Sequence, residues 1–208
     1  MNYPNNVIFS FNNLKKYYKR KLILDIKNYS FIEGKCYAII GENGSGKSTL
    51  LKILLGIVIQ SKGICYKNPI YTISYLPDNI NLPYYISVNN FLNKIVDIKK
   101  VDRLKKQKLI DDNLNYFGIM EAKFKRIGAL SKGMKQKIMI IQAIINNPNV
   151  LIFDEAINGL DNITQEKLFS LITYYKNNGK TIILTTHYLD KYRKIIDTKL
   201  TIKNASFD

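Results

Sequence analysis

"GENGSGKST", residues 41–49, decides the fold, because it stands directly between the apolar run "CYAII" and the run "LLKILLG". Its glycines permit a tight backbone path that turns successive N–H groups inward around a phosphate, and the helix that follows adds its positive N-terminal end. The lysine neutralises phosphate charge, and the serine hydroxyl can bind Mg²⁺. An ordinary glycine turn would explain the glycines but not a Lys-Ser pair placed between a strand and a helix. The predicted nucleotide-binding loop consists of Gly41, Glu42, Asn43, Gly44, Ser45, Gly46, Lys47, Ser48 and Thr49.

Size and composition favour one folded domain. With 208 residues, the chain can form one α/β domain with an inserted subdomain, but not two large domains. No apolar stretch reaches the roughly 18 to 20 residues that a membrane-spanning helix needs. The start of the chain lacks the basic-then-apolar order of a secretory signal, so we expect a cytoplasmic protein. In that compartment Cys36 and Cys65 stay reduced.

The chain is strongly basic, with 32 Lys and Arg against 16 Asp and Glu and a formal net charge of +16. Such an excess favours an acidic partner: nucleic acid, an anionic membrane face or a nucleotide. A codon bias toward Ile, Asn, Lys and Tyr is an equally good explanation, because the lysines are spread along the chain rather than clustered. Of the acidic partners, an anionic membrane is favoured, and no nucleic-acid partner is expected.

The order of strand-like and helix-like segments predicts an α/β fold. Residues 7–40 are expected to form strands, of which 36–40 is buried because it is apolar without a break. Between about 79 and 147, apolar residues recur at three- and four-residue spacing, which indicates helices. Beyond them strands and helices alternate again. We predict a P-loop NTPase sheet core, residues 1–78 and 148–208, with an N-terminal antiparallel β subdomain and an inserted α-helical subdomain, residues 79–147.

A second motif is "NVLIFDE", residues 149–155, in which a buried strand delivers Asp154 and Glu155 at its end. Ligands bind at such strand ends in open α/β sheets. Asp154 can hold the Mg²⁺ shell, and Glu155 can orient and deprotonate an attacking water. Alone, an Asp-Glu pair after a strand is more often a solvated turn. The presence of the nucleotide-binding loop makes the catalytic interpretation the better one.

Two further motifs flank this strand: "LSKGMKQK", residues 130–137, and "NGLD", residues 158–161. With them, the sequence resembles the nucleotide-binding subunits of ATP-binding-cassette (ABC) proteins over essentially the whole chain. The resemblance implies that "GENGSGKST" is the Walker A motif, "LIFDE" the Walker B motif, "LSKGM" the signature and "NGLD" the D-loop. The signature is similar to that of the branch that serves bacterial exporters of drugs, peptides or lantibiotics.

The resemblance also implies ATP and Mg²⁺ as cofactors and a head-to-tail homodimer with two ATP molecules between the copies. Ser131 and the Gly133 N–H lie where a helix begins, which is an anion site without a phosphate in its own subunit. In the family this site caps ATP held by the second copy. Asp161 is then expected to lie across the interface.

Catalytic roles fall to Lys47, Glu155 and His187. His187 is the only histidine and follows the strand-like run "TIILTT", where a neutral imidazole could hydrogen-bond the γ-phosphate and hold the water. A lone histidine is otherwise more often structural. Tyr18 falls where the family stacks an aromatic ring on adenine, with Tyr17 as the neighbouring alternative.

The sequence departs from the family pattern at four positions. Asp78 stands where the family usually has a glutamine, so the expected metal ligands are Ser48, Asp78 and Asp154; alternatively, Asp78 is a turn residue after Pro77. Lys132 replaces the second glycine of the signature and Met134 its glutamine, while Ala156 replaces a common proline. None of these changes removes a group that the chemistry needs.

These expectations together predict an ATP-hydrolysing subunit of an ABC transporter, by subtype an exporter. The chain would lie peripherally on the cytoplasmic face of the cell membrane and drive a separately encoded permease, which docks near residues 78–91. The alternative is a soluble ABC ATPase that moves no substrate, such as a translation, repair or assembly factor. Those proteins usually carry two cassettes or a long coiled-coil insertion, and 208 residues contain neither.

Overall fold

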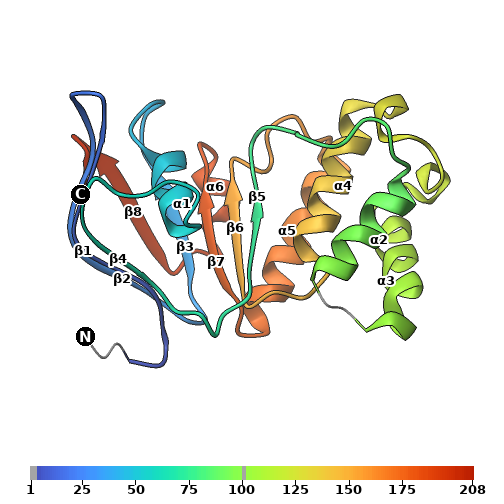
Figure 1. The fold of residues 1–208 in the computed structure, drawn as a ribbon, viewed down its shortest axis with the longest axis horizontal. Helices are drawn as coiled ribbons and strands as arrows, with labels where there is room; N and C mark the ends of the chain where they lie inside the picture. Colours follow the sequence, from blue (N-terminus) through green and yellow to red (C-terminus); the bar gives the residue numbers. More distant parts are fainter. Residues whose placement is uncertain (1–3, 100–101) are drawn as a thin grey trace.

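The computed structural model describes residues 4–99 and 102–208, which form two β-sheets and a group of helices (Figure 1). The three-stranded sheet lies at one end of the molecule and helices α2 and α3 at the other, with the six-stranded sheet between them. Among the described residues, no helix combines the length and apolarity needed to cross a membrane.

The six-stranded sheet has the order β5-β6-β7-β3-β8-β9. Its strands pair in parallel except β9, which is antiparallel to β8. The bounds are β3 Cys36–Ile40, β5 Ile73–Leu76, β6 Val150–Asp154, β7 Thr181–Thr185, β8 Thr198–Lys203 and β9 Ser206–Phe207. All residues of β6 and β7 are buried, as expected for apolar strands with both sheet faces covered. Parallel pairing places the carboxyl ends of β3, β6 and β7 at the same edge of the sheet. The loop at 41–49, Glu155 and His187 follow these strand ends.

The three-stranded sheet is antiparallel, with the order β2-β1-β4. Its bounds are β1 Val7–Tyr18, β2 Lys21–Ile32 and β4 Lys62–Lys67. Phe31 anchors it by edge-on contacts with Phe9, Phe11, Tyr29 and Tyr37, at centroid distances of 4.9 to 6.1 Å. Because Tyr37 belongs to β3, these contacts join the small sheet to the central one.

Six α-helices and two 3₁₀ turns complete the described structure. Their bounds are α1 Lys47–Leu54, α2 Val88–Ile98, α3 Arg103–Tyr116, α4 Lys132–Ile144, α5 Asn162–Asn177 and α6 Leu189–Tyr192, with turns η1 Met120–Ala122 and η2 Ile127–Ala129. Ser87 caps α2 by accepting a hydrogen bond from Asn90 N, at 3.2 Å. Gly179 follows the end of α5 with a positive φ of 72°, the usual glycine stop of a helix.

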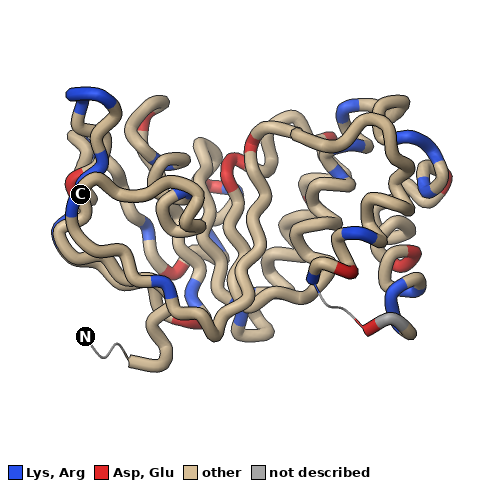
Figure 2. The backbone as a smooth tube through the Cα atoms, viewed as in Figure 1, with Lys and Arg blue, Asp and Glu red and all other residues tan. Residues whose placement is uncertain are grey.

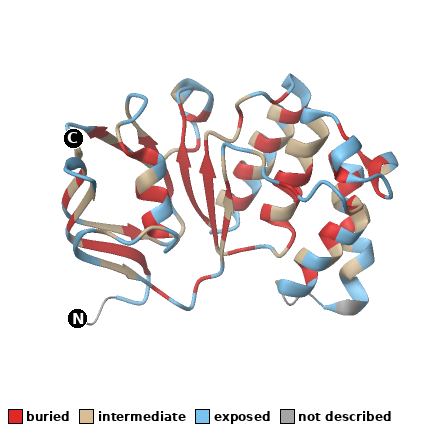
Figure 3. Ribbon diagram, turned by 45° about the horizontal axis from the view of Figure 1, so that its top comes forward, coloured by how far each residue is buried: buried red, intermediate tan, exposed pale blue. Residues whose placement is uncertain are grey.

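The hydrophobic core has two parts, one on each face of the central sheet (Figure 3). Alternate residues of β6 show the division. Leu151 and Phe153 belong to the part that includes α2, α3, α4 and α5, whereas Val150 and Ile152 belong to the part that includes α1 and the small sheet. Packing on both faces therefore holds the sheet in place, including the edge that carries the motifs.

The predicted α/β fold with an antiparallel N-terminal sheet is confirmed. The sequence missed α6 and β9, because four and two residues are too short to show periodicity. The helices expected between 79 and 147 are present, although residues 100–101 of that range lie outside the described residues. The division into core and subdomain stays a prediction. Neither cysteine is in a disulfide, and burial raises the pKa of Cys65 to about 11.

Candidate nucleotide site

The loop from 41 to 49 leaves β3 and enters α1, as its sequence predicts. Gly46 caps α1 with a φ of 108°, and a Cβ there would lie 2.9 Å from Leu24 Cδ2. A Cβ on Gly41 would lie 2.6 Å from Ser45 Oγ and 2.7 Å from the Ile202 carbonyl oxygen. Both positions therefore need glycine for space as well as for backbone conformation.

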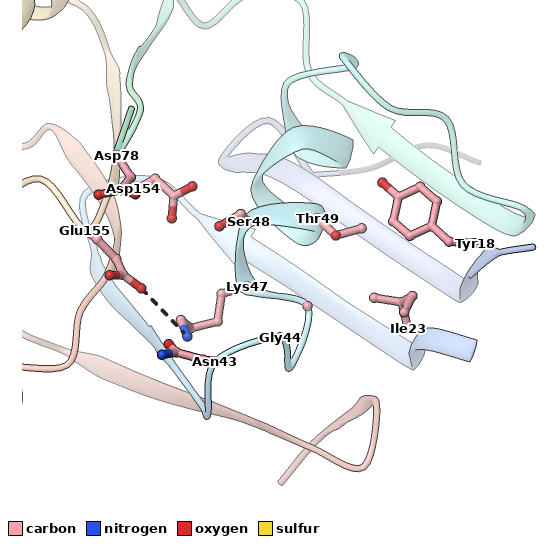
Figure 4. A pocket seen from close by; sticks show the side chains of 11 residues that line it. Tyr18, Ile23, Asn43, Gly44, Lys47, Ser48, Thr49, Asp78, Asp154 and Glu155 are labelled. Carbon is pink, nitrogen blue, oxygen red and sulfur yellow. Dashed lines mark ion pairs between the residues drawn. The ribbon is translucent and has the colours of Figure 1, made fainter. Parts of the chain in front are cut away.

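Lys47 lies inside this loop, and its side chain is only 5% exposed. Its ammonium group donates to the carbonyl oxygens of Gly41 at 2.9 Å and Glu42 at 3.1 Å. Glu155 Oε1 is 3.9 Å away (Figure 4). The positive charge is thus held at the centre of the loop, where a phosphate group would be neutralised.

Asp154 ends β6 and is buried, with two hydroxyl groups fixing its carboxylate. Thr185 Oγ1 donates to one oxygen at 2.7 Å, and the Tyr75 hydroxyl donates to the other at 3.2 Å. Burial and then the Asp154 charge raise the pKa of Tyr75, so that its hydroxyl remains a donor. The carboxylate is therefore held in place with lone pairs left for a hard cation.

Glu155 has a left-handed backbone with a φ of 50°, a conformation that costs about 1–3 kcal/mol in a non-glycine residue and is typical of functional sites. Its backbone N–H donates to Thr185 Oγ1 at 3.0 Å. On the carboxylate, Oε1 lies 2.9 Å from His187 Nε2, and Oε2 accepts a hydrogen bond from Asn158 Nδ2 at 2.7 Å. Both oxygens are thus oriented by neighbouring side chains.

Lys47, Asp154 and Glu155 border one cavity of about 510 Å³ (Figure 4). In Figure 4 the carboxylates of Asp78, Asp154 and Glu155 lie at one end and the Tyr18 ring at the other, with α1 between them. The lining residues are Tyr18, Ile23, Asn43, Gly44, Gly46, Lys47, Ser48, Thr49, Asp78, Asp154 and Glu155. The cavity therefore joins an aromatic surface, a phosphate-binding loop and a carboxylate cluster, which is the order of the parts of ATP and its metal.

The Asp78 carboxyl lies near two other acids. Burial, followed by the charges of Glu155 and Asp154, raises its pKa above the usual range, while a hydrogen bond from Asn158 and the charge of Lys132 oppose the rise. Ser48, Asp78 and Asp154 all line the cavity with oxygen atoms, and in Figure 4 the Ser48 hydroxyl is directed toward Asp154, so this donor set fits Mg²⁺, a hard cation that keeps several waters and binds phosphates. Within the described residues, no group of three or more His, Cys, Asp or Glu side chains is arranged to hold a metal alone.

Several predicted site residues do not line this cavity. Gly41, Glu42 and Ser45 line a neighbouring cavity, which shares Asn43 and Gly44 with the first. His187 contacts Glu155 from a third cavity, in which Asn158 and Lys191 also lie.

Ser131 of the signature and Asp161 of the D-loop serve as helix caps. Ser131 Oγ accepts from Met134 N at 3.2 Å at the start of α4. Asp161 accepts from both the backbone N–H and the hydroxyl of Thr164, at 2.8 Å each, and these bonds lower its pKa. Gly133 lies in the first turn of α4. Their expected contacts with a second ATP stay predictions.

Comparison with known proteins decides the family. The family model described as "ABC transporter" matches residues 24–158. The chain belongs to the ABC transporter family, as an ATP-binding protein. An uncharacterized ABC transporter ATP-binding protein of Methanocaldococcus jannaschii is 37% identical over 93% of this chain and 73% of its own length. The lantibiotic transport ATP-binding protein SrtF of Streptococcus pyogenes is 32% identical over 89% of this chain and 82% of its own.

The fold of this ABC protein agrees with that of a solved ATP-binding subunit of an ABC transporter. The TM-score is 0.88, at 24% identity, over 96% of this chain and 88% of the other. Three contacts in the ABC site were missed by sequence analysis: the Tyr75 and Thr185 bonds to Asp154, and the Asn158 bond to Glu155. Of these three contacts, that of Thr185 is the one that sequence analysis could have found, because the run "TTH" places Thr185 two residues before His187.

Proposed function

We propose that this chain is the ATP-hydrolysing subunit of an ABC exporter and that it drives a separate membrane permease. The observation that carries the proposal is the single cavity in which Lys47, Asp154 and Glu155 meet. A nucleotide kinase would need the loop but has no use for a water-activating glutamate beside it.

ATP binding follows from the loop and the aromatic end of the cavity. The Lys47 ammonium group exchanges the carbonyl oxygens of Gly41 and Glu42 for β- and γ-phosphate oxygens. Tyr18, with a 46% exposed side chain, offers its ring to adenine. When bound, Mg²⁺ supplies charge neutralisation at the phosphates, and Ser48, Asp78 and Asp154 would hold it.

Glu155 acts as the general base for water. Its Oε1 lies 2.9 Å from His187 Nε2 and 3.9 Å from Lys47 Nζ, and a water placed against the γ-phosphate can donate to this oxygen. His187, beside Glu155, then hydrogen-bonds either the same water or an oxygen of the γ-phosphate. The left-handed backbone at Glu155 fixes the direction in which the carboxylate points.

Dimerisation completes the site. Ser131, Gly133 and Asp161 lie outside the cavity of their own protomer, and α4 begins at the signature with its N–H groups. A second copy, placed head to tail, would bring these N–H groups to the γ-phosphate and the Asp161 segment to the interface. ATP binding then closes the homodimer and hydrolysis opens it.

The permease is proposed to dock on the helical subdomain, residues 79–147, which projects from a core of residues 1–78 and 148–208. Tyr84 and Tyr85 are exposed there by 59% and 89%. Figure 2 shows lysines and arginines at many places along the chain rather than in one segment, as a nucleic-acid-binding segment would have them. The chain would therefore lie on the cytoplasmic face of the membrane through its partner, and export is supported by the similarity to a lantibiotic transport protein.

The catalytic part of the proposal is tested by Glu155→Gln, measured in the presence of the permease. The substitution keeps the shape of the side chain but removes the base, so ATP still binds while hydrolysis falls by about 10²–10⁴-fold. An ATP-bound dimer should accumulate. Glu166→Gln, on the exposed face of α5, is the matched control. Parent-like turnover of Glu155→Gln would remove the proposed base.

The transport part is tested by co-purification from detergent-solubilised membranes. We expect a multi-span protein with two copies of this chain, and we expect Tyr85→Asp to release it. Tyr174→Asp, at a residue 63% exposed on α5, should leave the complex intact. Recovery with ribosomes or DNA instead, stable at high salt and without any membrane protein, would favour the soluble ABC ATPase.

A further inference from the structure

Asn158 connects two parts of the molecule, the proposed base Glu155 and helix α4. The side-chain amide of Asn158 donates to Glu155 Oε2 at 2.7 Å, and the backbone carbonyl oxygen of Asn158 accepts from Gln136 Nε2 at 2.8 Å. Gln136 belongs to α4, the helix that begins with the signature. One residue thus contacts the proposed base with its side chain and the signature helix with its backbone.

The bond to Glu155 fixes the carboxylate from the side that His187 does not reach. His187 and Lys47 lie near Oε1, so Asn158 is the donor that holds Oε2. The amide N–H of Asn158 can only donate to the carboxylate. This bond therefore orients the Glu155 oxygens without competing for the proton that Glu155 takes from water. Asn158 is absent from the residues that line the ATP cavity.

The same amide also lies next to Asp78. A hydrogen bond from Asn158 opposes the rise in the pKa of the Asp78 carboxyl, and both residues line a cavity that Glu155 and Gln136 of α4 also line. Asn158 therefore interacts with two carboxylates whose charges repel each other. Its loss should disturb the acidic end of the site and leave the adenine end unchanged.

Gln136 holds Asn158 through a tight contact. A Cβ on Gly159 would lie 3.1 Å from Gln136 Nε2, and the Gly159 backbone is left-handed with a φ of 74°. Only the amide nitrogen of Gln136 can donate to a carbonyl oxygen, which fixes its orientation; the buried Oε1 has no hydrogen-bond partner in the described structure. A rotation of α4 must therefore move Asn158 or break this bond.

We infer that Asn158 is a positioning residue for Glu155 and that Gln136 couples it to the orientation of α4. The inference rests on the proposed function, in which Glu155 is the base and α4 contacts the second ATP. In the closed dimer, α4 then sets the position of the Glu155 carboxylate through two hydrogen bonds within one protomer. Hydrolysis is thereby linked to the placement of the signature helix.

The test compares Asn158→Ala, Asn158→Asp and Gln136→Leu with Glu155→Gln in the full chain with its permease. For Asn158→Ala we expect kcat to fall by about 10-fold while KM for ATP changes by less than about 2-fold, since orientation is lost but the nucleotide contacts remain. Asn158→Asp keeps the size of the side chain and loses the donor, so its kcat should fall at least as far. Asn115→Ala, on the exposed side of α3, is the control.

Gln136→Leu separates coupling from local packing. Its effect on kcat should be present in the parent and absent in the Asn158→Ala background, because Gln136 acts on the base through the Asn158 side chain. Additive effects would overturn the coupling. Parent-like kcat in both Asn158 variants, with Glu155→Gln impaired, would overturn the positioning role alone, as would a rise in KM without a fall in kcat. Parent-like kcat in Glu155→Gln would overturn the proposed function together with this inference.

Discussion

Replacing Lys99 with methionine should change how the stability of the protein depends on pH. Lys99 ends α2, and its ammonium group donates to Ser74 Oγ at 3.1 Å, to the Gln142 carbonyl oxygen at 2.6 Å and to Asn146 Oδ1 at 2.9 Å. All three acceptors are neutral. Burial lowers the pKa of Lys99 from 10.5 to about 8. The side chain thus joins α2 to β5 and to the end of α4 while carrying a charge that the surroundings disfavour.

The sign of the effect follows from the proton count. Between pH 8 and 10.5 the unfolded chain keeps the Lys99 proton while the folded protein loses it, so the free energy of unfolding rises with pH. For this shift, the contribution of Lys99 rises by ~1–2 kcal/mol between pH 7.5 and 9.5. Below pH 8 both states are protonated and the dependence ends. The Lys99→Met variant lacks this term at every pH.

Urea unfolding followed by far-UV circular dichroism can measure it, since the chain contains no tryptophan. The difference in free energy of unfolding between parent and Lys99→Met should grow in favour of the parent by ~1–2 kcal/mol from pH 7.5 to 9.5. Groups that titrate in both proteins, such as the tyrosines, cancel in this difference. Lys94→Met, at an exposed position of α2, shows what the loss of a surface lysine does. A difference that is constant or that falls with pH would refute the argument.

The other predictions concern the nucleotide site and its helix caps. Asp78→Ala and Asp78→Gln should both bind ATP, but Asp78→Gln should transport more substrate per ATP hydrolysed in reconstituted vesicles; equal transport by both variants and the parent would make Asp78 a turn residue only. Tyr18→Ala should raise KM for ATP about 10-fold and Tyr18→Phe should not, since the stacking surface is lost only in the first. Asp161→Ala should lower the free energy of unfolding by about 0.5–2 kcal/mol, because a helix cap with two acceptor bonds is lost. Since the folded pKa of Asp161 is lowered, this contribution is present above pH 3.8 and disappears as the pH falls through the folded value, which acid unfolding of parent and variant would show.

The parts of the site that the sequence predicts well are those fixed by local geometry. The loop at 41–49 needs glycines where a Cβ would clash, and β6 must be apolar because both faces are covered. Such requirements leave a mark on the sequence at fixed spacing. The strand ends then follow, because parallel strands present their carboxyl ends at one edge of the sheet.

The contacts that the sequence could not predict depend on how distant elements cross. Tyr75 reaches Asp154 because β5 pairs with β6, and this pairing has no local signal. Asn158 follows Glu155 by only three residues, but its side chain reaches the carboxylate because the chain turns back after the left-handed Glu155, and the distant Gln136 of α4 meets the same turn. Neither distance is set by spacing along the chain alone.

Helix caps and ATP contacts need not exclude each other at the signature. Ser131 Oγ accepts a bond from Met134 N, but its own hydroxyl hydrogen remains available as a donor. The cap fixes the start of α4 and so directs its free N–H groups outward. The cap that Ser131 forms within one protomer is therefore compatible with the contact to ATP of the second copy that is predicted for the signature.

The two charged departures from the family pattern belong together for an electrostatic reason. Asp78 adds a third carboxylate beside Asp154 and Glu155, and burial, followed by the charges of Glu155 and Asp154, raises the pKa of Asp78. Lys132 lines the cavity that Asp78 also borders, and its positive charge acts in the opposite direction. In the resembling family these positions are a glutamine and a glycine, both neutral. Exchanging a neutral pair for an acid and a base that line the same cavity keeps the summed charge near the site unchanged. The extra carboxylate therefore need not weaken phosphate binding by the loop.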